Sequence, residues 1–193
     1  FFLLTKVTFA EYKTYVGVQG GFIYSDNEGN ADKTAQDLAD ASGRTVTYTY
    51  EELTWGIRPY GGFNVNDKVS IEVGYIFSGS LDETYKGSTA ASGAWNATQG
   101  VSVDGVDGAV KFNFDNLYAK IGMHQLTVEA FAGFTSNGFT YNGGASRSGS
   151  GFLLGGGYQD SLGDDLYWNA EYVYYESVGG ISNATMSFFA VGI

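Results

Sequence analysis

The chain has 193 residues, enough for one domain, with 29 Gly, 15 Tyr, 14 Phe, one Pro and no Cys. This composition favours many strands joined by turns over helices, and it excludes a disulfide framework or a thiolate metal site. The formal net charge of −11 argues against nucleic-acid binding, which needs an excess of Lys and Arg. No apolar run reaches about 18 residues, so a membrane-spanning form would have to be a β-barrel.

The first ten residues, FFLLTKVTFA, are mostly apolar and end on a small residue, Ala10. This pattern is compatible with the remnant of a secretory signal, although Lys6 is unusual there and no basic segment precedes Phe1. The alternative is an N-terminal extension kept in the mature chain. We therefore expect residues 1–10 to be one of these two, and residues 11–193 to form a single barrel domain.

The next part of the chain alternates strand patterns with polar segments. Residues 12–24, 45–63 and 69–77 place apolar side chains on one face and Gly or polar side chains on the other, which is the period of a strand between two environments. Residues 25–50 and 78–108 are rich in Asp, Gly, Ser and Thr and lack this period over most of their length. We expect them to be long loops, with a helical turn near residues 35–41 and extended structure returning from Thr45.

A fourth strand pattern begins at Val110, and its phase slips near Asp115 and Asn116, which predicts a β-bulge there. The segment Leu117 to Phe134 then has apolar residues at odd positions up to Met123 and at even positions from Leu126. A two-residue turn at His124 and Gln125 would explain this switch. It would make the segment a hairpin in which Lys120 faces Glu129.

Further strand patterns continue from this hairpin to Asn142, and then cover residues 152–158, 166–174 and 181–193, with a Gly/Ser loop at 143–150. The count is eight. The connections alternate between long and short, as in outer-membrane barrels, where short turns face the periplasm and long loops face outward. The expected fold is all-β: a closed, antiparallel, eight-stranded, up-and-down transmembrane β-barrel.

The sequence resembles the eight-stranded barrels of the outer membrane protein A and opacity-protein type. The resemblance rests on YVGVQGGF (15–22), RPYGGFNVNDKVSIEVGY (58–75), LYAKIG (117–122) and LLGGGYQDSLGDDLYWNAEYVY (153–174). It implies a bacterial outer-membrane location. Such barrels usually end on an aromatic residue shortly after a VGI-like stretch, so the resemblance also implies that residues, or a further domain, follow Ile193.

The family resemblance implies a polar network inside the barrel. Its candidate residues are Gln19, Arg58, Glu72, Lys120, Glu129, Asn169 and Glu171. Family members often carry a basic residue where this chain has Asn169, which leaves two cations facing three carboxylates and argues against a simple ion-pair gate. Eight strands enclose a space just wide enough for side chains, so a polar core is the expected role of this network.

Three functions are compatible with this pattern. The first is a structural or surface-interaction role through loops 25–50 and 78–108, because loops on a rigid scaffold carry function. The expected partners are outer-membrane lipid, lipopolysaccharide and another envelope or surface protein. The second is a narrow channel or solute-binding barrel that uses the interior charges. The third is a lipid-modifying enzyme, for which the sole histidine, His124, lies unfavourably in the predicted short turn. No cofactor or metal is expected, because the acidic groups lack calcium-loop spacing.

Overall fold

The computed structural model describes residues 13–25, 28–42, 45–89 and 93–193. Its elements follow the chain in this order: β1 (Thr14–Tyr24), α1 (Glu28–Ser42), β2 (Thr47–Tyr50), β3 (Leu53–Asn66), β4 (Val69–Ser78), β5 (Leu81–Thr89), β6 (Gly93–Phe114), β7 (Leu117–Ser136), β8 (Phe139–Ser161), β9 (Tyr167–Glu176), the 3₁₀ turn η1 (Val178–Gly180) and β10 (Thr185–Gly192). Residues 1–10, predicted as a signal remnant or extension, lie outside the described residues. Within the described part, no helix is both long and apolar enough to cross a bilayer.

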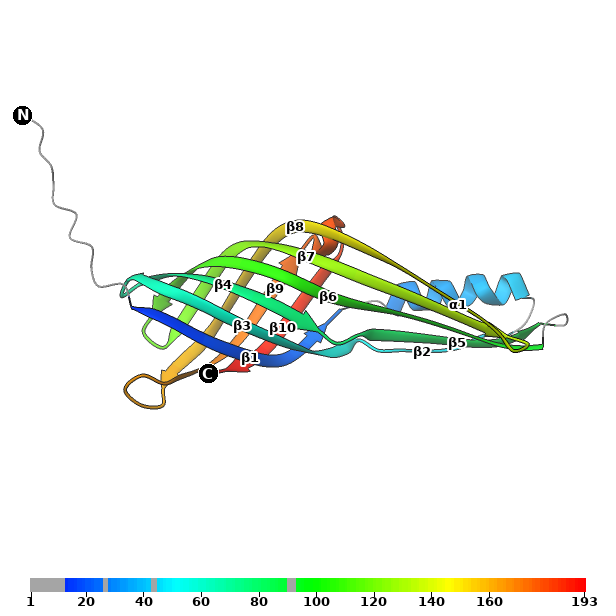
Figure 1. Ribbon diagram of the computed structural model, residues 1–193, viewed down its shortest axis with the longest axis horizontal. Coiled ribbons are helices and arrows are strands. Elements are labelled where there is room, and N and C mark those ends of the chain that lie inside the picture. Colours follow the sequence, from blue (N-terminus) through cyan, green and yellow to red (C-terminus); the bar gives the residue numbers. More distant parts are fainter. Residues whose placement is uncertain (1–12, 26–27, 43–44, 90–92) are drawn as a thin grey trace, which may run out of the picture.

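Eight long strands form a closed antiparallel barrel (Figure 1). The order around the ring is β1, β3, β4, β6, β7, β8, β9 and β10, and β10 pairs again with β1. The predicted eight-stranded up-and-down barrel is confirmed. Two short strands branch from it: β5 pairs with the first part of β6, and β2 pairs with β5.

Short turns close one end of the barrel, which we call the short-turn end. Asp67 and Lys68 join β3 to β4, and residues 162–166 join β8 to β9. The third turn, at Asp115 and Asn116, lies where a β-bulge was expected, and that prediction is wrong. These residues are a two-residue turn, with Phe114 paired to Leu117 and Asp115 at φ 54°, because β6 ends here and the chain reverses into β7.

The predicted hairpin at residues 117–134 is also wrong. β7 is one uninterrupted strand of 20 residues, and His124 pairs with Asp107 on one side and Gly151 on the other. The chain instead reverses at Asn137 and Gly138, whose φ angles of 50° and 79° are those of a type I′ hairpin turn.

The phase switch that suggested a turn has a different cause: β7 leaves the membrane there. Up to Met123 its outward side chains are apolar and its inward ones include Lys120. Beyond Met123 the inward face continues with Leu126, Val128 and Ala130, and the outward face gains the polar residues Gln125, Thr127, Glu129 and Thr135 beside the aromatic Phe131. The strand keeps its direction while the solvent outside it changes from lipid to water.

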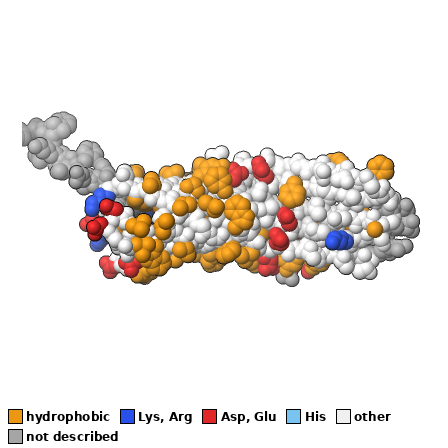
Figure 2. All heavy atoms as spheres, turned by 60° about the horizontal axis from the view of Figure 1, so that its bottom comes forward, with side chains coloured by type: hydrophobic (Ala, Val, Ile, Leu, Met, Phe, Trp, Pro, Cys, Tyr) orange, Lys and Arg blue, Asp and Glu red, His pale blue; other side chains and the backbone are white. Residues whose placement is uncertain are grey.

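An apolar belt surrounds the half of the barrel nearer the short-turn end. Figure 2 shows hydrophobic side chains gathered over this half, with acidic side chains where the belt stops. Its outward, exposed members include Val16, Val18, Phe22, Trp55, Ile57, Ile71, Val73, Phe77, Val106, Phe112, Leu117, Ile121, Met123, Phe152, Leu154, Phe189 and Val191. Such a belt is the lipid-facing surface of a transmembrane barrel.

The opposite, long-loop end is more ordered than predicted. Residues 25–50 contain α1 and β2, residues 78–108 contain β5 and much of β6, and the predicted loop at 143–150 belongs to β8. Ala35 of α1, Tyr85 and Trp95 form a small buried cluster there. Figure 1 shows this folded region extending the molecule far beyond β1, β9 and β10.

Candidate functional site

The barrel interior holds buried charged side chains, and Arg58 on β3 is at their centre. Arg58 donates two hydrogen bonds to Asp107 on β6, from Nε to Oδ2 over 2.8 Å and from Nη2 to Oδ1 over 2.6 Å. Its Nη1 lies 2.9 Å from Oε1 of Glu72 on β4 and 3.0 Å from Oε1 of Gln19 on β1. All four side chains are buried. The guanidinium is therefore well partnered, as a buried charge must be.

Lys120 on β7 forms a second centre next to the first. Its Nζ lies 2.6 Å from Oε1 of Glu171 on β9 and 3.5 Å from Oε1 of Glu72. Tyr118 donates a hydrogen bond from its hydroxyl to Oε2 of Glu171 over 2.9 Å. Because Glu72 contacts both Lys120 and Arg58, the two centres form one continuous network.

Two amide side chains, Gln19 of β1 and Asn169 of β9, extend the network across the interior to Tyr60 of β3. Gln19 donates from Nε2 to Oδ1 of Asn169 over 2.8 Å, and Asn169 donates from Nδ2 to the hydroxyl of Tyr60 over 2.9 Å. The structure thus brings together six of the seven candidate residues: Gln19, Arg58, Glu72, Lys120, Asn169 and Glu171.

Glu129 lies outside this network. Since β7 does not turn, Glu129 pairs with Ser102 and Ser146, and its side chain is exposed. The neighbours of Lys120 in the sheet are Lys111 and Gly155. The predicted buried pair of Lys120 and Glu129 is therefore wrong.

Two charged side chains of the interior, Asp107 and Lys111, are absent from the predicted network, although the alternation after Val110 does predict an inward Lys111. Asp107 was assigned to a loop, although it lies four residues before Lys111 and so shares its inward face. Lys111 donates from Nζ to Oε1 of Gln159 over 2.6 Å and lies 3.9 Å from the centre of the Tyr118 ring. Continuing the alternation of β6 backward from Lys111 would have found Asp107.

His124 is buried in the wall of the barrel instead of lying in a turn. Its Nε2 is 2.8 Å from the carbonyl oxygen of Glu176, so this nitrogen carries the proton, since a carbonyl only accepts. The ring meets Tyr175 edge-on at 5.5 Å. Nδ1 is buried and has no hydrogen-bond partner among the described residues.

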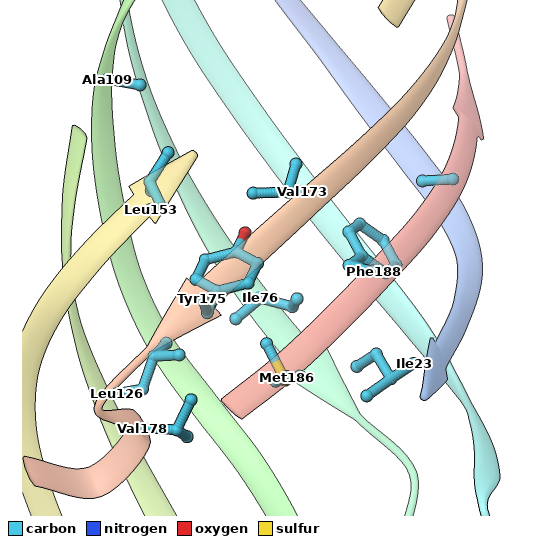
Figure 3. Packing of buried hydrophobic residues seen from close by; sticks show 11 residues of the cluster. Ile23, Ile76, Ala109, Leu126, Leu153, Val173, Tyr175, Val178, Met186 and Phe188 are labelled. Carbon is cyan, nitrogen blue, oxygen red and sulfur yellow. The ribbon is translucent and has the colours of Figure 1, made fainter. Parts of the chain in front are cut away.

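Above the network, toward the long-loop end, the interior becomes apolar (Figure 3). Five side chains of this layer have no exposed surface: Ile76, Leu126, Val173, Tyr175 and Phe188. The Tyr175 hydroxyl donates to Oδ2 of Asp107 over 3.0 Å, which joins the apolar layer to the charged network. The two layers together fill the interior, as expected for an eight-stranded barrel.

The described residues contain no group of three or more His, Asp or Glu side chains placed to hold a metal ion. The interior carboxylates are already occupied by Arg58, Lys120 and tyrosine hydroxyls. The arrangement suits internal neutralisation of charge.

The profile of the OmpA-like transmembrane domain matches residues 10–192. The chain belongs to this family. The OmpA-like barrel is accordingly a protein of the bacterial outer membrane, in which its apolar belt faces lipid.

Several solved outer-membrane barrels resemble this OmpA-like chain. Ail, the attachment invasion locus protein of Yersinia pestis, was solved alone and with the heparin analogue sucrose octasulfate; it shares 11% identity over 92% of this chain and 94% of its own, with a TM-score of 0.45. Neisserial surface protein A shares 13% over 93% and 96%, with a TM-score of 0.37. OprG from Pseudomonas aeruginosa shares 10% over 92% and 93%, with a TM-score of 0.39. No curated protein matches the chain significantly.

Proposed function

We propose that this OmpA-like barrel is a surface protein that contacts another protein through its long-loop end, while its filled interior stabilises the barrel. The observation that carries this proposal is the folded region beyond the belt. It consists of α1, β2, β5 and the outer parts of β6, β7 and β8 (Figure 1). A region of this size has no role in spanning lipid, and outward loops and extensions are where barrels carry function.

Exposed aromatic side chains mark the tip of this region. Phe139 is 80% exposed and Tyr141 is 72% exposed, and both follow the Asn137–Gly138 turn directly. Aromatic side chains are typical anchors of protein interfaces, because they bury a large area at a small cost in conformational entropy. The tip therefore supports a protein partner.

The charge of the long-loop end indicates which partners fit. Residues 25–52 contain seven Asp and Glu against Lys33 and Arg44. Acidic surfaces favour partners with basic groups and repel polyanions. For this chain we therefore propose a basic protein surface, and we do not propose a sulfated sugar of the kind found bound to Ail.

Neither a channel nor an enzyme is as well supported. Among the described residues, the interior contains side chains without exposed surface in both the charged and the apolar layer, including Arg58 and Phe188, and such filling argues against conduction. His124 is buried against Glu176 and Tyr175, away from any substrate in solution. We propose that the protein is not an enzyme, and that its other contacts are lipid and lipopolysaccharide at the belt.

Retention of proteoliposomes on coated surfaces tests the proposal. The full chain is placed in neutral phosphatidylcholine vesicles, which are passed over immobilised basic proteins, acidic proteins and heparin. We expect retention on basic protein coats, loss of most of it in the double variant Phe139→Ser with Tyr141→Ser, and no retention on heparin.

The matched control is Leu162→Ser, which removes a side chain of 59% exposure at the short-turn end. It should retain vesicles like the unmodified chain. Equal retention of the tip variant, or retention on heparin alone, would contradict the proposed surface.

A further inference from the structure

One side of β8 lacks a neighbouring strand in the long-loop end. β8 pairs with β7 from its first residue onward, whereas β9 joins its other side only at Leu153. η1 lies against part of the remaining edge, since a Cβ atom at Gly149 would be 2.1 Å from the Gly180 nitrogen. Of the described residues, none forms a hydrogen bond to this side of the segment 139–146, which we call the free edge.

The free edge presents its peptide groups to water. In an antiparallel sheet, every second residue directs its N–H and C=O away from the strand with which it is paired. Every residue of the free edge except Gly143 is exposed, so the rest of the described chain does not cover it. A row of accessible N–H and C=O groups is a template on which a further strand can form.

The free edge also lacks the features that prevent such pairing. Edge strands are commonly protected by Lys or other charged side chains, by Pro or by a β-bulge. The segment reads FTYNGGAS, with no charged residue and no Pro, and its register with β7 runs without a shift. Gly143 and Gly144 leave room for another backbone to approach closely.

A hollow of about 570 Å³ borders the free edge on its inward side. Gly143 and Ala145 line it from β8, and Ala130 and Ala132 line it from β7. Successive side chains of an added strand point to opposite faces, so every second one would face this hollow and bury apolar surface there. Figure 3 shows three apolar side chains that line the hollow from the barrel interior: Ile23, Val178 and Met186.

We propose that the free edge binds an extended segment of a partner protein as an additional strand, with apolar side chains at alternate positions facing the hollow. Main-chain hydrogen bonds supply the affinity of such a contact, and the alternate side chains supply its specificity. The inference rests on the proposed protein-contacting role of the long-loop end and names the element that makes the contact. A second copy of this chain fits less well, because two copies in one membrane present β8 in the same direction and parallel pairing is less stable.

A labelled peptide tests the proposal. The probe has about ten residues, enough to span the free edge, alternates Val with Thr and ends in two Lys for solubility. Its binding to the full chain in phosphatidylcholine nanodiscs is followed by fluorescence anisotropy, with empty nanodiscs as the blank. We expect saturable binding. N-methylation of every amide keeps the side chains and the charge but should weaken binding by about tenfold or more, as expected for loss of one or two net hydrogen bonds.

Disulfide cross-linking tests the orientation of the added strand, because the chain has no Cys of its own. Ala145→Cys lies on the side of the hollow, and its matched partner Ser146→Cys lies on the opposite face. A probe with one Val replaced by Cys should cross-link roughly tenfold more with Ala145→Cys, since adjacent residues of a strand point to opposite faces. A probe with one Thr replaced by Cys should prefer Ser146→Cys.

Folding of each variant is checked by the heat-dependent gel shift of a closed barrel. The proposal is overturned if the probe does not bind saturably, if the N-methylated probe binds equally well, or if cross-linking shows no preference between the two faces. Disulfide dimers of either Cys variant that exclude the probe would assign the free edge to a second copy and would also overturn it.

The peptide test and the retention test fail separately. Retention of vesicles on basic protein coats without binding of the probe would overturn the free edge as the contact and leave the proposed function intact. Binding of the probe without retention on those coats would contradict the basic protein partner and not the pairing at the free edge.

Discussion

Arg58 reaches Asp107 across an intervening strand, and Gly74 on that strand makes the contact possible. Gly74 pairs with both Tyr60 of β3 and Asp107 of β6. A Cβ atom at Gly74 would lie 2.5 Å from Nε of Arg58. The bidentate ion pair therefore depends on a missing side chain as much as on the two charged ones.

Replacing Asp107 with Leu should lower the free energy of unfolding by about 3–5 kcal/mol, because it leaves part of the Arg58 guanidinium buried without a partner. Urea unfolding in lipid vesicles, followed by tryptophan fluorescence, measures this change. The matched control on the same strand is Asp104→Asn, which keeps an acceptor for the Tyr75 hydroxyl and should cost less than about 1 kcal/mol. Equal losses of unfolding free energy in the two variants would contradict a special contribution of the Arg58–Asp107 pair to stability.

Two adjacent glycines of β1 should differ in their tolerance of the same substitution. A Cβ at Gly21 would lie 1.8 Å from the Phe189 carbonyl oxygen, whereas Gly20 has nothing within 4 Å. Gly21→Ala should push β1 from β10 and cost about 1–3 kcal/mol or more, and Gly20→Ala should be nearly neutral. The fraction of closed barrel after refolding, read from the heat-dependent gel shift, distinguishes them; similar yields would contradict the β1–β10 geometry.

The apolar layer should seal the barrel against ions. In planar bilayers the unmodified chain should show no reproducible open state, and Phe188→Ala combined with Ile76→Ala should introduce openings, because both side chains are fully buried in the layer. Phe189→Ala is the control, since this neighbour is 53% exposed on the outer face. A reproducible open state of the unmodified chain would instead favour the channel.

The Tyr85 hydroxyl should lose its proton at a higher pH than an ordinary tyrosine. Burial next to Glu83 raises the pKa of Tyr85 to about 12. The folded chain then holds this proton more tightly than the unfolded chain, whose tyrosines titrate near pH 10. The resulting stability is complete below about pH 10 and is lost as the pH rises toward 12. The phenolate absorbance difference between the unmodified chain and Tyr85→Phe measures the midpoint; a value near 10 would contradict the buried position.

The barrel was predictable because lipid and a filled interior impose opposite rules on alternate residues. The inward positions of Arg58, Glu72 and Glu171 followed directly from strands that lie mostly within the belt. The same rule misled at β7, where the solvent outside changes at Met123 while the strand continues. The change of phase was interpreted as a turn, which placed His124 and Glu129 wrongly.

Other features were predictable in principle. Asn137–Gly138 is a strong hairpin signal, but the apolar phase switch at Met123 took precedence over it. The space lined by Ile23, Val128 and Met186 has no such local signal, because these residues of β1, β7 and β10 come together only when the ring closes. The alternation of apolar and polar residues therefore predicted the strands of the barrel better than the packing inside its long-loop end.

The same change of polarity also fixes how deep the protein sits in the membrane. Phe77, Asp104 and Thr127 lie side by side on β4, β6 and β7. On these three neighbouring strands, the outer face therefore changes from apolar to polar at the same height. Sinking the barrel by two residues, about 7 Å along a strand, would bring Asp104 and Glu129 into hydrocarbon at an energetic cost. The seven residue steps from Glu129 to Ser136 then hold the aromatic tip about 24 Å further along the strand. A partner would therefore meet Phe139 and Tyr141 at a constant distance from the bilayer, set by a few outward side chains far from the contact itself.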